Sequence, residues 1–209
     1  MANISSETAL EYLAAGLSCL PAARAKKHPT VGSWKTWSER LPTQVEVSAW
    51  FANRQDAICV VAGGVSGNLE CIDFDNKGEL FAAWIERVNT GLLGRLVVEQ
   101  TPSGGYHVLY RTDHAVDGNL KLARGLVDGK LITKIETRGE GGLFLCSPTE
   151  GYVLQQGSFS EIPTINGEAR EALLNAARVL DETPAQVVAL GPEERHVGPG
   201  FGLSGATGG

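Results

Sequence analysis

The sequence predicts an α/β fold of the α+β kind, built around a mixed or antiparallel sheet. Three observations support this prediction: short apolar runs typical of strands recur through the middle of the chain, few helical patterns separate them, and an amphipathic helical pattern stands near each end. Neighbouring parallel strands need a long crossover, commonly a helix, whereas antiparallel strands are joined by tight turns. The shortage of helices between strands therefore favours antiparallel pairing.

Apolar residues at helical spacing predict four helices. Ser5 or Ser6 is available as the cap of the first, and Thr43 with Glu46 forms a capping box that opens the second. Asn166 is available as the cap of the last. The expected helices span residues 7–17, 43–50, 78–88 and 167–180.

The strands are expected where apolar runs are bounded by turn residues. The run from Ala57 to Val61 is continuously apolar, which is typical of a strand covered on both faces. The next strand leads directly into the third helix, and a Thr-Pro-Ser-Gly-Gly turn joins two later strands. The expected strands span residues 57–61, 69–75, 96–100, 106–111, 131–136 and 143–146.

Composition places the chain among globular proteins. It has 209 residues, 43% hydrophobic and 20% charged, which excludes the fibrous, disordered and disulfide-scaffold classes. No uncharged apolar run approaches the roughly 20 residues of a membrane span, and no signal-peptide pattern opens the chain. We therefore expect a cytoplasmic protein with no membrane partner, whose four separated cysteines are buried free thiols.

The end of the chain differs from the rest in composition. Residues 191–209 hold seven glycines and almost no large apolar groups, so burial cannot offset the entropy cost of fixing them. We expect one domain over residues 1–184 and a flexible tail or interdomain linker over 185–209.

The formal net charge is −6, but the acids are concentrated in two stretches. Segment charges are +2 for residues 1–54, −4 for 55–90, +1 for 91–140 and −5 for 141–209. A protein that binds a phosphate polymer in a groove needs only a local positive field, so the overall sign does not exclude a nucleic-acid partner. For each of Lys26, Lys27, Lys121, Arg124 and Arg138 separately, a solvated basic surface is the favoured interpretation over a template contact.

Asp73 and Asp75 form an acid-x-acid pattern at the end of the second expected strand. Side chains alternate along a strand, so both carboxylates project from one face. Their repulsion favours a bound cation, and oxygen ligands suit magnesium or manganese. The alternative is a strand end that carries ordinary turn-forming aspartates.

The segment Thr101 to His107 is the second chemical pattern. Gly104 and Gly105 let backbone N–H groups approach an anion closely, and the Ser103 hydroxyl adds a donor. His107 can donate to a phosphate oxygen, so the turn is a candidate triphosphate cradle. The alternative is an ordinary hairpin turn beside a structural histidine.

On an extended segment that includes the end of the fifth expected strand, Lys134, Glu136 and Arg138 face one way. A carboxylate between two cations fits a metal ligand flanked by groups that neutralise phosphate. The alternative is an exposed salt-bridged strand. Taken with Asp73, Asp75 and His107, the pattern supplies three acids and a phosphate donor, an inventory that suits nucleotidyl transfer by two divalent ions.

At these residues the sequence resembles the archaeo-eukaryotic primase superfamily, and specifically the bifunctional primase-polymerase domain of phage, plasmid and mobile-element replication proteins. The first motif of the family resembles Ile72 to Asp75, the second resembles Thr101 to His107, and the third resembles Ile135 to Gly142 with Pro148 after it. The N-terminal pattern of the family is similar to Ala9 through Gly16, Lys26 to Pro29 and Trp34. The resemblance covers residues 7–155.

The resemblance implies a primase-type catalytic core over residues 1–184, in which an N-terminal αβ unit packs against an RRM-like sheet. It implies that Asp73, Asp75 and Glu136 bind Mg²⁺ or Mn²⁺, that His107 and Ser103 hold the triphosphate of a dNTP or NTP, and that Gly104, Gly105 and Arg138 also contact the nucleotide. The implied partners are a single-stranded DNA template, a primer and a fused or separate helicase module. Glu136 departs from the pattern of the family, in which the third acid is more often Asp. The sequence also shows no cluster of cysteines or histidines of the kind that forms a zinc stem.

Two other functions fit parts of the pattern. A nucleotide-sugar glycosyltransferase also binds a metal through D-x-D, but it leaves His107 and Glu136 without roles. A catalytically silent RRM-like module would need stacking aromatics on exposed strands, for which Phe74, Tyr106 and Tyr110 are the candidates. A rolling-circle nickase is disfavoured because no H-x-H pattern occurs.

Overall fold

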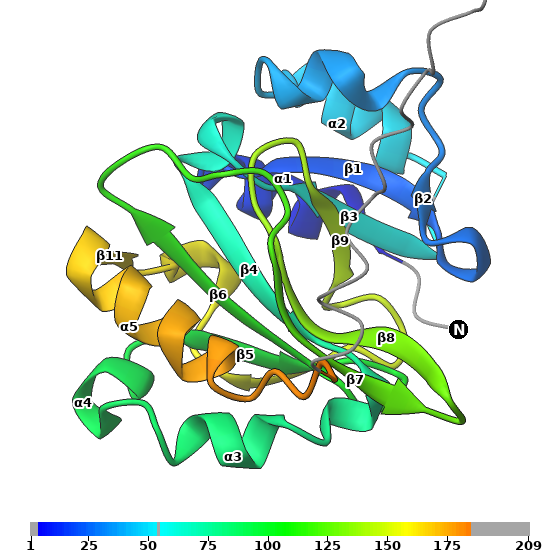
Figure 1. The fold of residues 1–209 in the computed structure, drawn as a ribbon. Coiled ribbons are helices and arrows are strands. Elements are labelled where there is room, and N and C mark those ends of the chain that lie inside the picture. The colour runs from blue at the N-terminus through cyan, green and yellow to red at the C-terminus, as the bar shows by residue number, and fades with distance from the viewer. Residues whose placement is uncertain (1–3, 54, 185–209) are drawn as a thin grey trace, which may run out of the picture.

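The computed structural model describes residues 4–53 and 55–184 as two antiparallel sheets with helices on their outer sides. Helices α3, α4 and α5 cover one face of the larger sheet, and α1 and α2 lie on the far side, next to the smaller sheet (Figure 1). The α-helices are α1 (Ser6–Ala14), α2 (Gln44–Phe51), α3 (Phe81–Ile85), α4 (Thr90–Leu93) and α5 (Gly167–Arg178).

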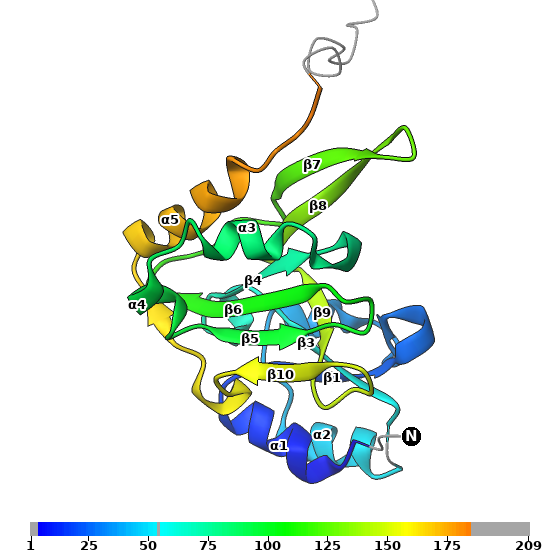
Figure 2. The same cartoon turned by 90° about the horizontal axis from the view of Figure 1, so that it is seen from below.

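The larger sheet has the strand order β10-β5-β6-β4-β8-β7, and β11 pairs with β6. Every pairing is antiparallel except that of β11 with β6. The hairpin of β7 and β8 projects beyond the neighbouring strands (Figure 2). The strands are β4 (Leu69–Phe74), β5 (Val97–Gln100), β6 (Tyr106–Thr112), β7 (Lys121–Val127), β8 (Lys130–Arg138), β10 (Val153–Gln156) and β11 (Thr164–Ile165).

The smaller sheet has the order β2-β1-β3-β9 and is antiparallel throughout. Its strands are β1 (Ser18–Ala23), β2 (His28–Pro29), β3 (Ala57–Val61) and β9 (Leu143–Cys146). Short 3₁₀ turns complete the fold: η1 (Arg24–Lys26), η2 (Trp34–Ser38), η3 (Gly64–Ser66), η4 (Asn76–Gly78) and η5 (Phe159–Glu161).

Each face of β4 packs into a different core. Ile72 and Phe74 lie among the residues under α3 and α5, whereas Leu69 and Cys71 lie in the core shared with α1, α2 and the smaller sheet. This alternation follows from the two-residue period of a strand. Asp73 shares the second face, so its carboxylate points toward the space between the two sheets.

A buried ion pair fastens α5 to the first of these faces. Glu70 of β4 has no exposed surface, and both of its oxygens accept from the guanidinium of Arg170, at 2.7 and 2.8 Å. The hydroxyl of Tyr110 donates to the same carboxylate at 2.8 Å. The buried carboxylate of Glu70 therefore has both an opposite charge and hydrogen-bond donors beside it, as a buried charge requires.

The helix predictions are confirmed at three places and wrong at one. Ser5 caps α1, the Thr43–Glu46 capping box opens α2, and Asn166 caps α5. The helix expected over 78–88 is only the short helix α3 (81–85), and α4 is a separate, unpredicted helix that begins beyond residue 88. The side chain of Asn89 accepts from the N–H groups of Gly91 and Leu92, which starts a new helix there.

All six expected strands form, with ends that differ by no more than two residues in either direction. Strands β1, β2, β7, β10 and β11 were not predicted. Strand β1 contains Pro21 and small residues without apolar alternation, and β10 is largely exposed, so neither carries the pattern of a half-buried strand.

All four cysteines are free and buried, as predicted. Among the described residues, no helix combines the length and apolar character needed to cross a membrane. The expected tail over 185–209 lies outside the described residues.

Candidate active site

A row of titratable side chains crosses the larger sheet at one level. Asp73 of β4 is the register partner of His107 on β6 and of Glu136 on β8. His107 is in turn the partner of Glu99 on β5, and Glu136 is the partner of Lys121 on β7. Directly paired residues project from the same face. Antiparallel pairing thus brings together side chains that are far apart in the sequence.

Asp75 follows the end of β4 and joins Asp73 and Glu136 in an acidic cluster. One oxygen from each of the three carboxylates lies within 4.8 Å of the other two. Burial and the charge of Asp73 raise the pKa of Asp75. Burial, with the charges of Asp73 and Asp75, also raises the pKa of Glu136 although Arg138 opposes the shift. In both cases burial is the largest cause, and the neighbouring carboxylates add to it.

Arg138, at the end of β8, is the cation nearest to this cluster. Its guanidinium donates to Asp73 Oδ2 from Nη2 at 2.9 Å and from Nε at 3.3 Å, and it also pairs with Glu136. Burial acts to lower the pKa of Arg138, but the Asp73 charge and hydrogen bond and the Glu136 charge outweigh it, so the net shift is upward. One guanidinium therefore bridges two of the three acids.

His107 is buried between two carboxylates. Its Nδ1 lies 2.8 Å from Glu99 Oε1, and its Nε2 lies 3.6 Å from Asp73 Oδ1. Burial acts to lower the pKa of the imidazole, but the hydrogen bond to Glu99 and the charges of Asp73 and Glu99 raise it above its ordinary value. The ring therefore has one nitrogen fixed by Glu99 and the other directed toward the acidic cluster.

The turn before His107 is held by its own hydrogen bonds. The N–H of Gly104 donates to the Thr101 carbonyl at 3.0 Å, and the hydroxyls of Thr101 and Ser103 are 3.0 Å apart. The Gly104 N–H is thus already used, which corrects the expectation that it is free for an anion. Gly105 is required for a different reason: a Cβ there would overlap the Phe74 carbonyl.

The segment that follows Asp75 packs directly on this turn. Asn76, Lys77 and Gly78 all have positive φ, at 51°, 59° and 66°. A Cβ on Gly78 would meet the Gly104 carbonyl and the ring of Tyr106. Two successive non-glycine residues in the left-handed region are unusual and are held by their surroundings. This tight turn places the strand end of Asp75 beside the Ser103 turn.

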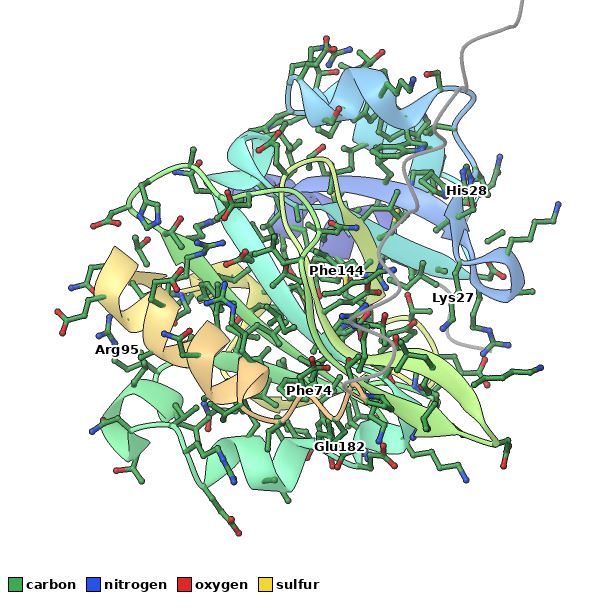
Figure 3. All side chains as sticks on the ribbon, in the orientation of Figure 1. Lys27, His28, Phe74, Arg95, Phe144 and Glu182 are labelled. Atoms are coloured by element: carbon green, nitrogen blue, oxygen red, sulfur yellow. The ribbon has the colours of Figure 1, made fainter. Side chains whose placement is uncertain are left out.

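These residues line a cleft of about 480 Å³ between the two sheets. Asp73, Asp75, Ser103, His107 and Arg138 line one side, and β9 contributes Leu143, Phe144 and Leu145. The far wall comes from the small sheet and its loops, through Lys27, His28 and Trp34. In Figure 3, Lys27 extends from the loop that joins β1 to β2, His28 extends from the first position of β2, and Phe144 lies nearer the centre of the molecule.

The sequence model of one protein family, described as "Bifunctional DNA primase/polymerase, N-terminal", matches residues 9–164 of the chain. The match includes the acidic cluster, the Ser103 turn, His107 and Arg138. The chain belongs to this family. No curated protein sequence matches it. As a member of the bifunctional DNA primase/polymerase family, the chain is assigned in general terms to the nucleotidyltransferases of DNA replication, which act on DNA and nucleotides.

One expectation about the primase/polymerase site is wrong. Lys134 was expected to flank Glu136, but its ammonium is held by Glu79 at 2.7 Å and Glu182 at 2.9 Å. Figure 3 places Glu182 at the lower end of the molecule, beside the β7–β8 hairpin. The cation opposite Glu136 is Lys121 instead, whose charge acts to lower the pKa of Glu136.

Sequence reasoning did not single out Glu99, Tyr152 or Glu140. Glu99 shares its strand face with Val97, so an acid at an inward position of an apolar strand was the available signal. Tyr152 lines the cleft 5.9 Å from the ring of His107. Glu140 accepts from the N–H of Gly64 at 2.7 Å and so fastens the β8–β9 turn, which carries Gly141 and Gly142 of the cleft, to the β3–β4 loop. Nothing in its spacing identified Glu140.

Proposed function

We propose that the chain catalyses metal-dependent, template-directed transfer of a nucleoside monophosphate from a dNTP or NTP to a 3′-hydroxyl, with release of pyrophosphate. The observation that carries the proposal is the convergence of Asp73, Asp75 and Glu136 within 4.8 Å, at a cleft that Asp73, Asp75 and His107 line. Membership of the primase/polymerase family supports the same reaction class.

The three carboxylates fit Mg²⁺ or Mn²⁺. They offer hard oxygen donors at the spacing of a shared cation, and the mutual repulsion that contributes to the raised pKa values of Asp75 and Glu136 supports this assignment. We assign Asp73, Asp75 and Glu136 as the metal ligands. A bound pair of such ions supplies a polarised 3′-oxygen and charge neutralisation on the leaving pyrophosphate.

The remaining residues of the site are assigned to the triphosphate. His107 Nε2 and the exposed Ser103 hydroxyl donate to phosphate oxygens, and Gly104 and Gly105 allow the turn to lie close to them. Arg138 and Lys27 approach from two sides of the cleft, and the charge of Lys27 already acts on Asp75. Cations and hydrogen-bond donors around the phosphates provide the electrostatic stabilisation on which phosphoryl transfer depends.

We further propose that the larger sheet is the RRM-like sheet of a primase-type core. Its central strands β6, β4 and β8 are antiparallel, carry the acids and His107 on one face, and are covered by helices on the other. The biological setting that we propose is replication of a phage, plasmid or mobile element. A single-stranded template and a primer enter the cleft, and a fused or separate helicase module opens the duplex.

The alternatives are less well supported. A D-x-D glycosyltransferase would leave Glu136 and His107 without roles, although both converge with the aspartates. A silent RRM-like module would need exposed stacking aromatics, but Phe74 and Tyr110 are buried and Tyr106 stacks on Phe81 at 3.9 Å. The aromatics that sequence reasoning offered for that function are therefore core residues.

A primer-extension and de novo priming assay with Mg²⁺ or Mn²⁺ tests the proposal. We expect extension by the wild type and at least a 100-fold loss in the Asp73→Ala plus Asp75→Ala variant, because both proposed metal ligands on β4 are removed. Glu86→Ala, which removes an exposed acid beyond the site, is the matched control. Equal activity in all three proteins, or turnover of a UDP-sugar instead, would overturn the proposal.

A further inference from the structure

Glu99 is a buried carboxylate that the proposed chemistry does not use. It has no exposed surface, and it lies on β5, which β6 separates from β4 and the acidic cluster. Transfer of a carboxylate from water to the interior is costly unless its oxygens are hydrogen-bonded. Within the described part of the chain, the donors to Glu99 are the imidazole of His107, at 2.8 Å, and the N–H of Ser147, at 2.9 Å.

These two hydrogen bonds connect the two walls of the cleft. His107 belongs to the larger sheet, whereas Ser147 directly follows β9 of the smaller sheet. The carbonyl of Ser147 also accepts from the hydroxyl of Tyr12 in α1 at 2.6 Å. Glu99 therefore holds the imidazole and the backbone at the end of β9 with one rigid carboxylate group.

The imidazole is also confined on its other sides. The ring of Phe144 meets it edge-on at 5.3 Å between centroids, and the ring of Tyr152 lies at 5.9 Å. With Nδ1 bonded to Glu99, Nε2 is the ring nitrogen left near the cleft, 3.6 Å from Asp73. The direction of Nε2 is thus determined by the partner of Nδ1.

We infer that Glu99 is a positioning residue for nucleotide binding, which accepts from Nδ1 of His107 and so holds the ring with Nε2 directed at the triphosphate. The inference rests on the proposed function of the cleft and adds a residue to it. The physical reason is preorganisation: a ring already held in its binding orientation loses less freedom when a phosphate arrives. Without Glu99, the imidazole can rotate away from this orientation.

The experiment compares Glu99→Gln with Tyr110→Phe. Tyr110 donates to Glu70, another fully buried carboxylate, from the opposite face of β6. Its replacement removes a buried hydrogen bond of the same kind without touching the cleft. For Glu99→Gln we expect the KM for dNTP in primer extension to rise about tenfold with a smaller change in kcat, as for loss of one charge-assisted hydrogen bond. For Tyr110→Phe we expect lower thermal stability and an unchanged KM.

A second readout needs no activity and no variant of Glu99. A long-range ¹H–¹⁵N spectrum of the nucleotide-free wild type reports which ring nitrogen of each histidine carries a proton. The chain has four histidines, and the signals of His107 are identified as those that disappear in His107→Gln. We expect a proton on Nδ1. A ring protonated at Nε2 alone would overturn the inference, and so would equal KM changes in the two variants. Absence of primer extension in the wild type, with Nδ1 protonated, would instead overturn the proposed function.

Discussion

Asp73 and His107 face each other across β4 and β6, with Asp73 Oδ1 3.6 Å from His107 Nε2. The relationship links the two halves of the proposed site, because Asp73 belongs to the acidic cluster and His107 follows the Ser103 turn. Adjacent strands fix this distance through their register, so it does not depend on a loop.

Removal of the Arg138 side chain is expected to raise the affinity for metal and to lower the affinity for nucleotide. Its guanidinium competes with a cation for Asp73 and Glu136, so Arg138→Ala should bind Mn²⁺ more tightly than the wild type when no nucleotide is present. The same variant should bind dNTP about tenfold or more weakly, because a charged phosphate contact is lost. Calorimetric titration of each ligand measures both. Parallel weakening of both affinities would contradict this account, and Arg138→Lys should restore part of the nucleotide affinity.

Asp75→Asn is expected to stabilise the metal-free protein at neutral pH. The pKa of Asp75 is raised from its ordinary value of 3.8 by burial and by the charge of Asp73, so the ionised carboxylate opposes folding. An acid with a raised folded pKa reduces stability as the pH rises above its unfolded pKa, and has no such effect when both states are protonated. The melting temperature should therefore increase by a few degrees at pH 7, and the difference should vanish below pH of about 4. A lower melting temperature for Asp75→Asn at pH 7 would argue against mutual repulsion in the cluster.

Gly105→Ala is expected to destabilise the fold and distort the Ser103 turn. The added Cβ would overlap the carbonyl of Phe74, which is backbone and cannot move aside easily. We expect a loss of about 1–3 kcal/mol, as for overpacking elsewhere. Gly32→Ala is the matched control, because a Cβ at Gly32 meets nothing within 4 Å. Urea denaturation measures the difference in unfolding free energy between the two variants. Similar unfolding midpoints would show that the backbone at Phe74 can move away from position 105.

Arg170→Ala is expected to be among the most destabilising substitutions in α5. It leaves the carboxylate of Glu70 buried without its cation, which costs about 3–5 kcal/mol. Arg178→Ala, on the same helix, removes an exposed pair with Glu171 and should cost no more than about 0.5 kcal/mol. Guanidinium denaturation distinguishes the two. Comparable losses would mean that the Glu70–Arg170 pair does not hold α5 on β4.

The sequence predicted what local patterns determine. The caps at Ser5, Thr43 and Asn166 were readable because an N-cap is a contact within a few residues, and β3 was readable from a continuous apolar run. The alternation of Asp73 and Ile72 also gave the correct faces of β4. The division into two sheets was not readable, because pairing of β3 with β9 joins segments about eighty residues apart.

The candidate site shows the same division between local and long-range information. Asp73, Asp75, His107 and Glu136 were selected as residue types, and the register of β4, β6 and β8 brings them together. The position of Lys134 was predicted wrongly because its partners, Glu79 and Glu182, come from other parts of the chain. Glu99 was overlooked because its significance depends on His107, its partner on the neighbouring strand.

The central claim is that the three carboxylates and His107 together hold metal and nucleotide. The most direct test is anomalous diffraction from crystals grown with Mn²⁺ and a non-hydrolysable dNTP. We expect manganese peaks in contact with Asp73, Asp75 and Glu136, and the triphosphate within hydrogen-bond distance of His107 Nε2. Manganese and triphosphate bound away from these four side chains would contradict the account.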